Sequence, residues 1–210
     1  MAHTPAAVRR AQIIRAATTV IARDGVAGAT TRRIAAEAGL SLATLHYVFS
    51  TKDEILAAVL ASLIEDDQRG NATITAHLDT SVDTQRLTLP EVIHQLVRTA
   101  WDVASADPAL ARVEHELTLY ALRTPEAAHL GRDLNNYHLD ATEQIVDRTM
   151  EHTGHESPRP ARELAHLINC VMDGILLDHL VNPDSALTDR SLANLSDAIL
   201  ALVSPPVRVG

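Results

Sequence analysis

The sequence has few aromatic residues and a single cysteine. Of its 210 residues 2% are aromatic, so alanine, leucine, isoleucine and valine must fill the core. Strands prefer aromatic and β-branched side chains, and this composition therefore favours helices. A lone cysteine, Cys170, excludes an intrachain disulfide and suits a reducing compartment. Because Cys170 lies within an apolar run, we expect it to be buried and unreactive.

Long apolar runs are also missing. The first residues, Met1 to Pro5, contain no apolar signal core, and no stretch of about 18 apolar residues indicates a membrane span. We therefore expect a cytoplasmic protein without a membrane partner. The length of 210 residues and an apolar content of 46% fit a globular chain, either one large domain or a small domain attached to a larger one.

Charge is distributed unevenly along the chain. The formal net charge is −9 at pH 7, yet residues 1–50 hold six arginines and two acidic residues, which leaves +4 there and −13 on the remainder. Such asymmetry is typical of a protein whose basic N-terminal part binds the phosphates of a nucleic acid while its acidic remainder does not. A chance cluster of charges on a solvated face would have the same composition.

Helix signals recur throughout, and no strand-like alternation persists. Ser, Thr or Asp followed by Pro marks the first turn of a helix, and such pairs occur at 4–5, 107–108, 124–125 and 157–158. Capping-box spacing occurs at 51–54 and 88–91. The sequence predicts an all-α protein with about nine helices, near 5–23, 31–38, 42–48, 51–78, 89–105, 108–122, 125–153, 158–181 and 187–203.

One segment of the basic region, from Thr30 to Phe49, has the pattern of a helix, a tight turn and a second helix. Thr30 and Ser41 stand at N-cap positions, and Gly39 can take the left-handed conformation that ends the first helix sharply. Leu45 and Phe49, four residues apart, would anchor the second helix to the core. Such a unit holds its second helix outward, where it can enter a major groove of DNA.

The outward side chains of that second helix are small, hydroxyl-bearing or apolar. They allow close approach to base edges, and the apolar ones can touch thymine methyl groups. His46 could titrate and make binding depend on pH, or could stay neutral against the backbone. Lys52, at the start of the next helix, could share one phosphate with free N–H groups. The candidate DNA-binding residues are Thr30, Arg32, Arg33, Ser41, Leu42, Ala43, Thr44, His46, Tyr47 and Lys52.

This pattern resembles the N-terminal signature of TetR-family regulators over roughly residues 8–56. The resemblance implies a three-helix helix-turn-helix DNA-binding domain at 1–50 and a helical ligand-binding and dimerisation domain at 51–210. His46 and Val48 stand where the family often has tyrosine, so no operator sequence can be transferred from a relative. The matching positions are Thr30, Ile34, Ala35, Ala38, Gly39, Ser41, Thr44, Leu45, Phe49, Lys52, Glu54 and Leu56.

The resemblance also implies a homodimer, formed through the helices near 158–181 and 187–203. Both carry wide apolar stripes, which a monomer's internal core would explain equally well. It further implies a pocket for a small-molecule effector of unknown identity. The candidate pocket residues are Val97, Trp101, Glu114, His115, Thr118 and Tyr137, each of which could instead serve packing or lie in solvent.

The function that the sequence favours is a ligand-responsive repressor, released from a palindromic operator in double-stranded DNA by its effector. The sequence has no Gly-rich phosphate loop, nucleophile elbow or metal-ligand spacing. We therefore expect no catalytic residues, no bound metal and no cofactor. The alternatives are a helical enzyme and an adaptor protein, neither of which would bind DNA.

Overall fold

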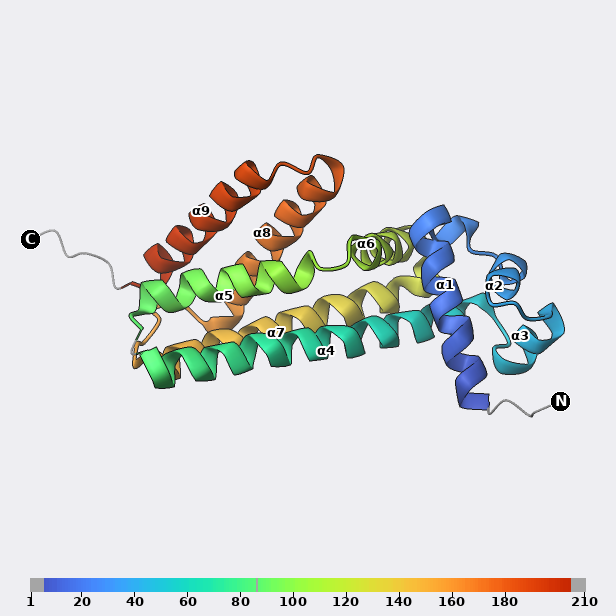
Figure 1. Ribbon diagram of the computed structural model, residues 1–210, viewed down its shortest axis with the longest axis horizontal. Helices are drawn as coiled ribbons and strands as arrows, with labels where there is room; N and C mark the ends of the chain where they lie inside the picture. Colours follow the sequence, from blue (N-terminus) through green and yellow to red (C-terminus); the bar gives the residue numbers. More distant parts are fainter. Residues whose placement is uncertain (1–5, 86, 205–210) are drawn as a thin grey trace, which may run out of the picture. The chain divides into compact units, whose positions relative to one another are not determined.

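The computed structural model describes residues 6–85 and 87–204, except for the side chains of residues 77 and 79–85 (Figure 1). The described part contains helices and no strands, which confirms the predicted fold class. The Thr4-Pro5 pair lies outside the described residues. The elements are α1 (Ala6–Gly28), α2 (Thr31–Glu37), α3 (Leu42–Val48), α4 (Lys52–Gln85), α5 (Leu89–Ala104), α6 (Pro108–Arg123), a 3-10 helix η1 (Pro125–Ala127), α7 (Ala128–Thr153), α8 (Ala161–Val181) and α9 (Ser185–Val203).

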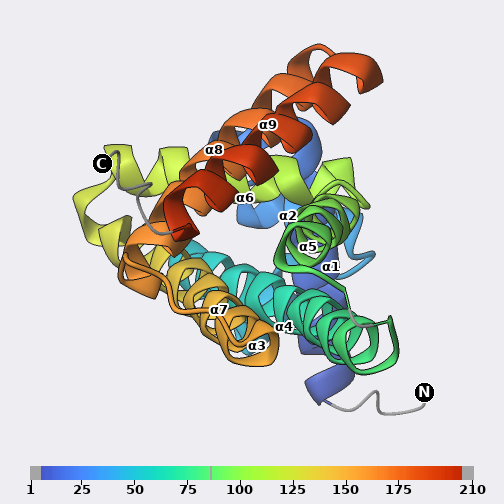
Figure 2. The ribbon, with the colours of Figure 1, turned by 90° about the vertical axis from the view of Figure 1, so that its left-hand side faces the viewer.

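The helices divide between two compact units. The first unit comprises the described residues of Met1–Asp67 and Asp107–Asn135, and the second those of Gln68–Ala106 and Asn136–Gly210. The first unit therefore contains the reading head, by which we mean α1 to α3, together with α6 and parts of α4 and α7. In the second unit α8 and α9 run side by side (Figure 2). A functional boundary at residue 50 stays a prediction.

The core of the first unit is aliphatic, with one aromatic ring. Ile13, Ala17 and Ile21 of α1 are fully buried and follow one another at intervals of four residues, so one face of the helix packs inward. Leu45 and Phe49 are also buried, which agrees with their expected role as the anchors of α3. Because side chains of α4 and α6 join the same cluster, the reading head is packed on the helices that follow it.

The turn between α2 and α3 has the predicted local chemistry. Gly39 is left-handed, with φ +64°. The hydroxyl of Thr30 accepts a hydrogen bond from the Arg33 N–H at 3.3 Å, and that of Ser41 accepts one from the Thr44 N–H at 3.1 Å. Each cap satisfies a donor that the first turn of a helix leaves without an intrahelical partner. The two short helices are therefore set by signals local to the sequence.

The first helix ends later than predicted. Near residue 23 we expected α1 to stop, but the chain passes through a kink at Gly25, with φ +70° and ψ 169°, and continues as helix to Gly28. Gly25 does interrupt the regular helix, as its place in the sequence suggested. The helical hydrogen bonding resumes beyond it, and the extra turn belongs to α1.

The fourth helix also continues beyond its predicted end at residue 78. The segment 79–88 was expected to be a loop, yet α4 extends to Gln85. Gly70 lies within the helix and does not break it. A Cβ atom at Gly70 would come within 2.5 Å of the Cγ1 atom of Val103 on α5. The glycine therefore serves the close approach of two helices, a requirement that the sequence alone does not reveal.

The eighth helix begins three residues later than predicted and is apolar but largely uncovered. By length and composition alone α8 could cross a membrane, with a mean hydropathy of 1.4 over an 18-residue window of which 17% is buried. The sequence shows no uninterrupted apolar stretch of this length, because polar residues interrupt the run, and the helix meets the criterion by its mean hydropathy. One such helix is weak evidence for a span. Cys170, expected to be buried, is exposed on it.

Candidate functional site

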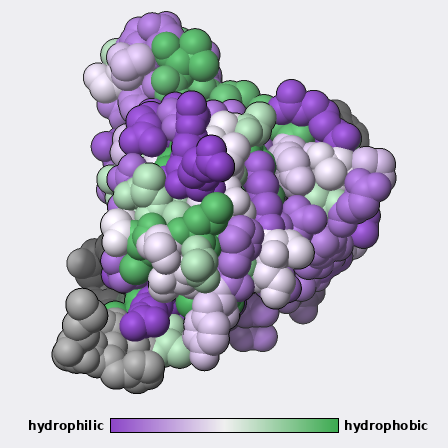
Figure 3. Space-filling model, turned by 90° about the vertical axis from the view of Figure 1, so that its right-hand side faces the viewer, coloured by the Kyte–Doolittle hydropathy of each residue, from purple (hydrophilic) through white to green (hydrophobic). Residues whose placement is uncertain are grey.

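The outer surface of α3 is accessible to a partner. Tyr47 is 82% exposed, and Leu42, Ala43 and His46 are exposed as well. Leu45, on the opposite side of the helix, is fully buried. The buried anchor fixes the orientation of α3 while four outward positions, two adjacent pairs one turn apart, stay exposed. Figure 3 views the molecule from the side on which Figure 1 shows the reading head, and apolar side chains there lie among hydrophilic ones.

The two hydroxyl groups at the start of α3 bind one another. The Oγ atom of Ser41 lies 2.8 Å from Oγ1 of Thr44, and either atom can be the donor. The Ser41 oxygen also accepts the Thr44 N–H. Whichever hydroxyl donates within the pair, one O–H hydrogen remains to bond an outside acceptor. The pair thus caps the helix and keeps one O–H group that can donate a hydrogen bond to a partner.

The arginines of α1 and α2 differ in how far they are engaged by carboxylates. Arg33 lies 3.3 Å from Asp24, and Arg23 bridges Asp24 at 3.1 Å and Glu37 at 3.3 Å. The hydrogen bond from Arg23 holds the pKa of Asp24 below its ordinary value. Arg32 is exposed, and no ion pair is recorded for it within the described ranges. Arg32 is therefore the more available cation of the two on α2.

Side chains of α4 and α6 hold the kink of α1 from both sides. The Val26 N–H donates to Oε2 of Glu116 on α6 at 3.1 Å, and the Val26 carbonyl accepts a hydrogen bond from Nζ of Lys52 on α4 at 2.6 Å. Beside this peptide, a Cβ at Gly25 would lie 2.9 Å from the same Glu116 oxygen. We call these contacts of Val26, Glu116 and Lys52 the kink clamp. It links three helices within the first unit.

Lys52 has an environment that the sequence did not indicate. Its ammonium lies 5.8 Å from the centre of the Tyr120 ring. Partial burial lowers the pKa of Lys52, because removal from water disfavours the charged form. One of its three N–H groups is directed at the Val26 carbonyl. The other two can still bind, so a phosphate contact by Lys52 stays a prediction beside its observed role in the kink clamp.

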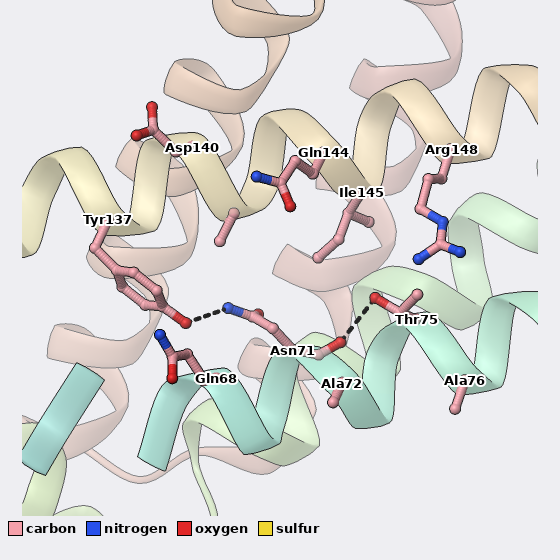
Figure 4. A pocket seen from close by; sticks show the side chains of 11 residues that line it. Gln68, Asn71, Ala72, Thr75, Ala76, Tyr137, Asp140, Gln144, Ile145 and Arg148 are labelled. Atoms are coloured by element: carbon pink, nitrogen blue, oxygen red, sulfur yellow. Dashed lines mark hydrogen bonds between the residues drawn. The ribbon is translucent and has the colours of Figure 1, made fainter. Parts of the chain in front are cut away.

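The second unit contains a groove between α4 and α7 with a volume of about 600 Å³ (Figure 4). The Asn71 side-chain amide donates to the hydroxyl of Tyr137 at 3.0 Å within it. Asp140 accepts a hydrogen bond from Arg162 at 2.8 Å, which offsets part of its charge. Amides, hydroxyls and a few apolar groups can together orient a small organic molecule. The lining residues are Gln68, Asn71, Ala72, Thr75, Ala76, Tyr137, Asp140, Ala141, Gln144, Ile145 and Arg148.

Two family models match this chain and together cover most of it. Residues 13–59 match the bacterial regulatory proteins of the tetR family, and residues 90–204 match the C-terminal part of BetI-type transcriptional repressors. The chain belongs to the TetR family. It is a helix-turn-helix transcriptional regulator, and the family resemblance noted from the sequence is confirmed.

Individual relatives extend over nearly the whole chain of this TetR-family regulator. The nicotine-responsive transcriptional repressor HdnoR of Paenarthrobacter nicotinovorans is 30% identical over 193 residues, covering 91% of this chain and 94% of the relative. The regulator BetI of Vibrio atlanticus is 24% identical over 195 residues, with 90% and 89% coverage. A solved TetR-family regulator from Mesorhizobium loti has the same fold, with a TM-score of 0.74, 21% identity and 95% and 98% coverage.

The ten residues predicted to bind DNA all lie in the first unit of this TetR-family regulator. Those on α3 share its outer surface, with Thr44 partly covered, and Arg32 and Arg33 are exposed on α2. Thr30 and Ser41 act as helix caps. Nine of them thus lie on or at the caps of the two short helices, whereas Lys52, at the start of α4, is directed at the kink of α1. Contact of each residue with DNA stays a prediction.

The six residues predicted to bind a ligand are divided between the two units. Tyr137 lines the groove of the second unit. Val97 and Trp101 are buried on α5, where Trp101 packs edge-on against the His179 ring at 5.2 Å between centroids. The remaining three, Glu114, His115 and Thr118, lie on α6 in the first unit. Ligand contact by any of the six stays a prediction.

The sequence reasoning missed the contribution of α4 to the groove. Gln68, Asn71 and Thr75 follow one another at intervals of three and four residues, so they share one face of a helix. This polar stripe was visible in the sequence. Its function is not apparent from the sequence, because the stripe lines a groove only once α4 packs against α7.

We expect Glu116→Ala to lower the free energy of unfolding by about 1–3 kcal/mol, because it leaves the buried Val26 N–H without its acceptor. Urea denaturation followed by circular dichroism measures the change. Glu116→Gln is the matched control, since its amide oxygen can still accept the bond and its loss should be clearly smaller. Equal losses in both variants would contradict the proposed importance of the acceptor.

Proposed function

We propose that this protein is a repressor that binds a palindromic operator as a homodimer and leaves it when a small molecule occupies the second unit. The observation that carries the proposal is the outer surface of α3, exposed at four positions while Leu45 and Phe49 anchor the helix in the core. A rigidly held, exposed second helix is what entry into a major groove requires. We place this activity in the cytoplasm and assign no catalysis to the chain.

The positive charge of the reading head supports its contact with the DNA backbone. Arg32 and Arg33 are exposed on α2, and Arg9 and Arg10 lie on α1. Such residues bind phosphates and set the register of a protein on the duplex without reading sequence. A single head reaches few phosphates and binds weakly, so two heads at a fixed spacing gain affinity through their effective concentration. The acidic remainder of the chain would be held away from DNA by its own charge.

We expect Arg32→Ala to weaken binding to all duplexes by a similar factor and to reduce the slope of log K against log salt by about one. Fluorescence anisotropy with a labelled duplex from the upstream region of the protein's own gene measures both quantities. Arg159→Ala, an exposed arginine between α7 and α8, is the control and should change neither. An unaltered slope for Arg32→Ala would remove Arg32 from the interface, and lack of binding to that duplex and to random duplexes would overturn the proposed function.

The uncovered face of α8 supports the homodimer. Leu167, Leu177 and Val181 are 40%, 49% and 78% exposed. Together with Cys170 and Gly174 they recur at alternating intervals of three and four residues, the pattern by which one helix presents a continuous apolar seam to another. An apolar surface of this kind is unfavourable in water. A second copy related by a twofold axis would cover it with the same surface.

We expect Leu177→Lys to raise the dissociation constant of the dimer at least about a hundredfold, because each copy would place an unpaired charge in the apolar seam. Sedimentation velocity over a range of concentrations measures the change. Leu122→Lys is the control, since Leu122 is 78% exposed on α6 and lies in the first unit. A dimer that persists in Leu177→Lys at the wild-type dissociation constant would place the interface elsewhere.

The groove between α4 and α7 supports an effector site. It offers the Tyr137 hydroxyl, the Asn71 and Gln144 amides and the apolar side chain of Ile145 to one small volume. A ligand can displace the repressor only by as much as it prefers the unbound conformation. The relative HdnoR is described as nicotine-responsive, and nicotine is therefore the first compound to try.

We expect nicotine to raise the melting temperature of the protein and to weaken its binding to the operator duplex, since a ligand that binds the folded state stabilises it. Tyr137→Phe should reduce nicotine affinity roughly tenfold, because the groove loses a hydroxyl. Tyr120→Phe, in the first unit, is the matched control. A melting temperature unaffected by nicotine would show that nicotine is not the effector. It would not bear on DNA binding, which the anisotropy measurement with the operator duplex tests.

A further inference from the structure

The outward face of α3 lacks the arginine, lysine, amide and carboxylate side chains that most often read bases in the major groove. From Leu40 to Ser50 the chain contains no arginine, lysine, asparagine, glutamine or acidic residue. In the major groove, arginine or lysine reads guanine through two hydrogen bonds, and asparagine or glutamine reads adenine in the same way. Glutamate or aspartate would accept from cytosine. The second helix of this reading head can form none of these contacts.

The polar groups that α3 does offer are few and form single bonds. Ser41 and Thr44 bind each other and retain one O–H hydrogen between them. Tyr47 presents one hydroxyl, and His46 presents two ring nitrogens on different edges of its imidazole, which do not form a fork like that of an arginine. A single hydrogen bond to a base edge discriminates less than a bidentate pair, because several bases share an acceptor at a similar place. Hydrogen bonding alone therefore gives α3 little means of choosing its sequence.

The apolar groups of the same face are exposed at the end that enters a groove first. Leu42 is 37% exposed, and Ala43 is exposed beside it. One turn further along, His46 and Tyr47 follow at the i+4 positions. The thymine 5-methyl is the apolar group on the major-groove edge of a base pair. Leucine and alanine methyl groups gain free energy when they are removed from water against it.

We propose that α3 selects its half-site chiefly through the 5-methyl groups of thymines, which Leu42 and Ala43 contact. The inference rests on the proposed DNA-binding function and adds to it the class of base that is read. The exposed arginines position the head on phosphates, and the apolar turn of α3 chooses the sequence. Each half-site then carries thymines opposite the start of α3, and cytosine, which has no methyl group there, is rejected.

The test removes the methyl groups and nothing else. An operator is first obtained by selecting, from a pool of random duplexes, those that the full-length protein binds. The recovered half-sites should contain thymine at recurring positions. Deoxyuridine then replaces each of those thymidines, which keeps every hydrogen-bonding group and removes one methyl. Loss of one buried methyl corresponds to about a fourfold rise in the dissociation constant. Fluorescence anisotropy at fixed salt measures this rise for each position.

A double-mutant cycle assigns the methyl contact to its side chain. In Leu42→Ala the effect of deoxyuridine at the contacted position should shrink towards onefold, because the partner of the methyl group is already gone. Leu122→Ala removes the same type of side chain from an exposed position on α6 and should retain the full effect. Deoxyuridine in the flanks of the operator is the matched DNA control and should leave affinity unchanged. Far-UV circular dichroism checks that Leu42→Ala is folded.

The outcomes separate this inference from the proposed function. Half-sites without thymine, or an operator bound equally well with deoxyuridine, would overturn methyl reading while operator binding itself stands. A deoxyuridine effect that persists in full in Leu42→Ala would overturn the assignment to Leu42. Absence of binding to any selected or random duplex would overturn both proposals together.

Discussion

The backbone of Val26 makes the contacts on which the position of the reading head depends within the first unit. Gly25 interrupts α1, so the Val26 N–H begins a new helical turn without an intrahelical acceptor. Because Val26 is 1% exposed, water cannot take that role, and Glu116 does so from α6. Lys52 binds the carbonyl from the other side. The N–H and the carbonyl of one residue thus join the reading head to two later helices, and a shift of α6 against α1 would break a buried hydrogen bond.

The reading head combines two kinds of surface of different chemistry. Arginines on α1 and α2 carry the charge of an N-terminal region whose net charge opposes that of the whole chain. Asp24 and Glu37 form ion pairs with some of these arginines and thereby fix their side chains on the surface. The outer face of α3 carries no arginine, lysine or acidic residue. Under the proposed function, affinity from phosphates and selectivity from base edges would therefore come from separate helices, and each could vary without the other.

Prediction from the sequence succeeded where the signals were local. The two short helices could be bounded closely, because their end signals depend only on residues within four positions along the chain. These signals are the caps at Thr30 and Ser41 and the left-handed turn at Gly39. Prediction failed at Gly70, because a glycine inside a helix suggests a break. Here a side chain at this position would collide with Val103 on α5. The groove was missed for the same reason, because Asn71 and Tyr137 meet only when α4 and α7 pack together.

The sequence by itself determined the helical class, the helix-turn-helix, its outward residues and the family, since these follow from hydrophobic spacing, caps and glycine within short windows. Only the tertiary structure decided that Lys52 binds the kink of α1, that α8 leaves Cys170 and an apolar face uncovered, and which residues line the groove. The physical reason is the range of the interactions. A cap or a turn is completed by its chain neighbours, whereas a buried peptide, a groove or an exposed face exists only once distant helices have packed.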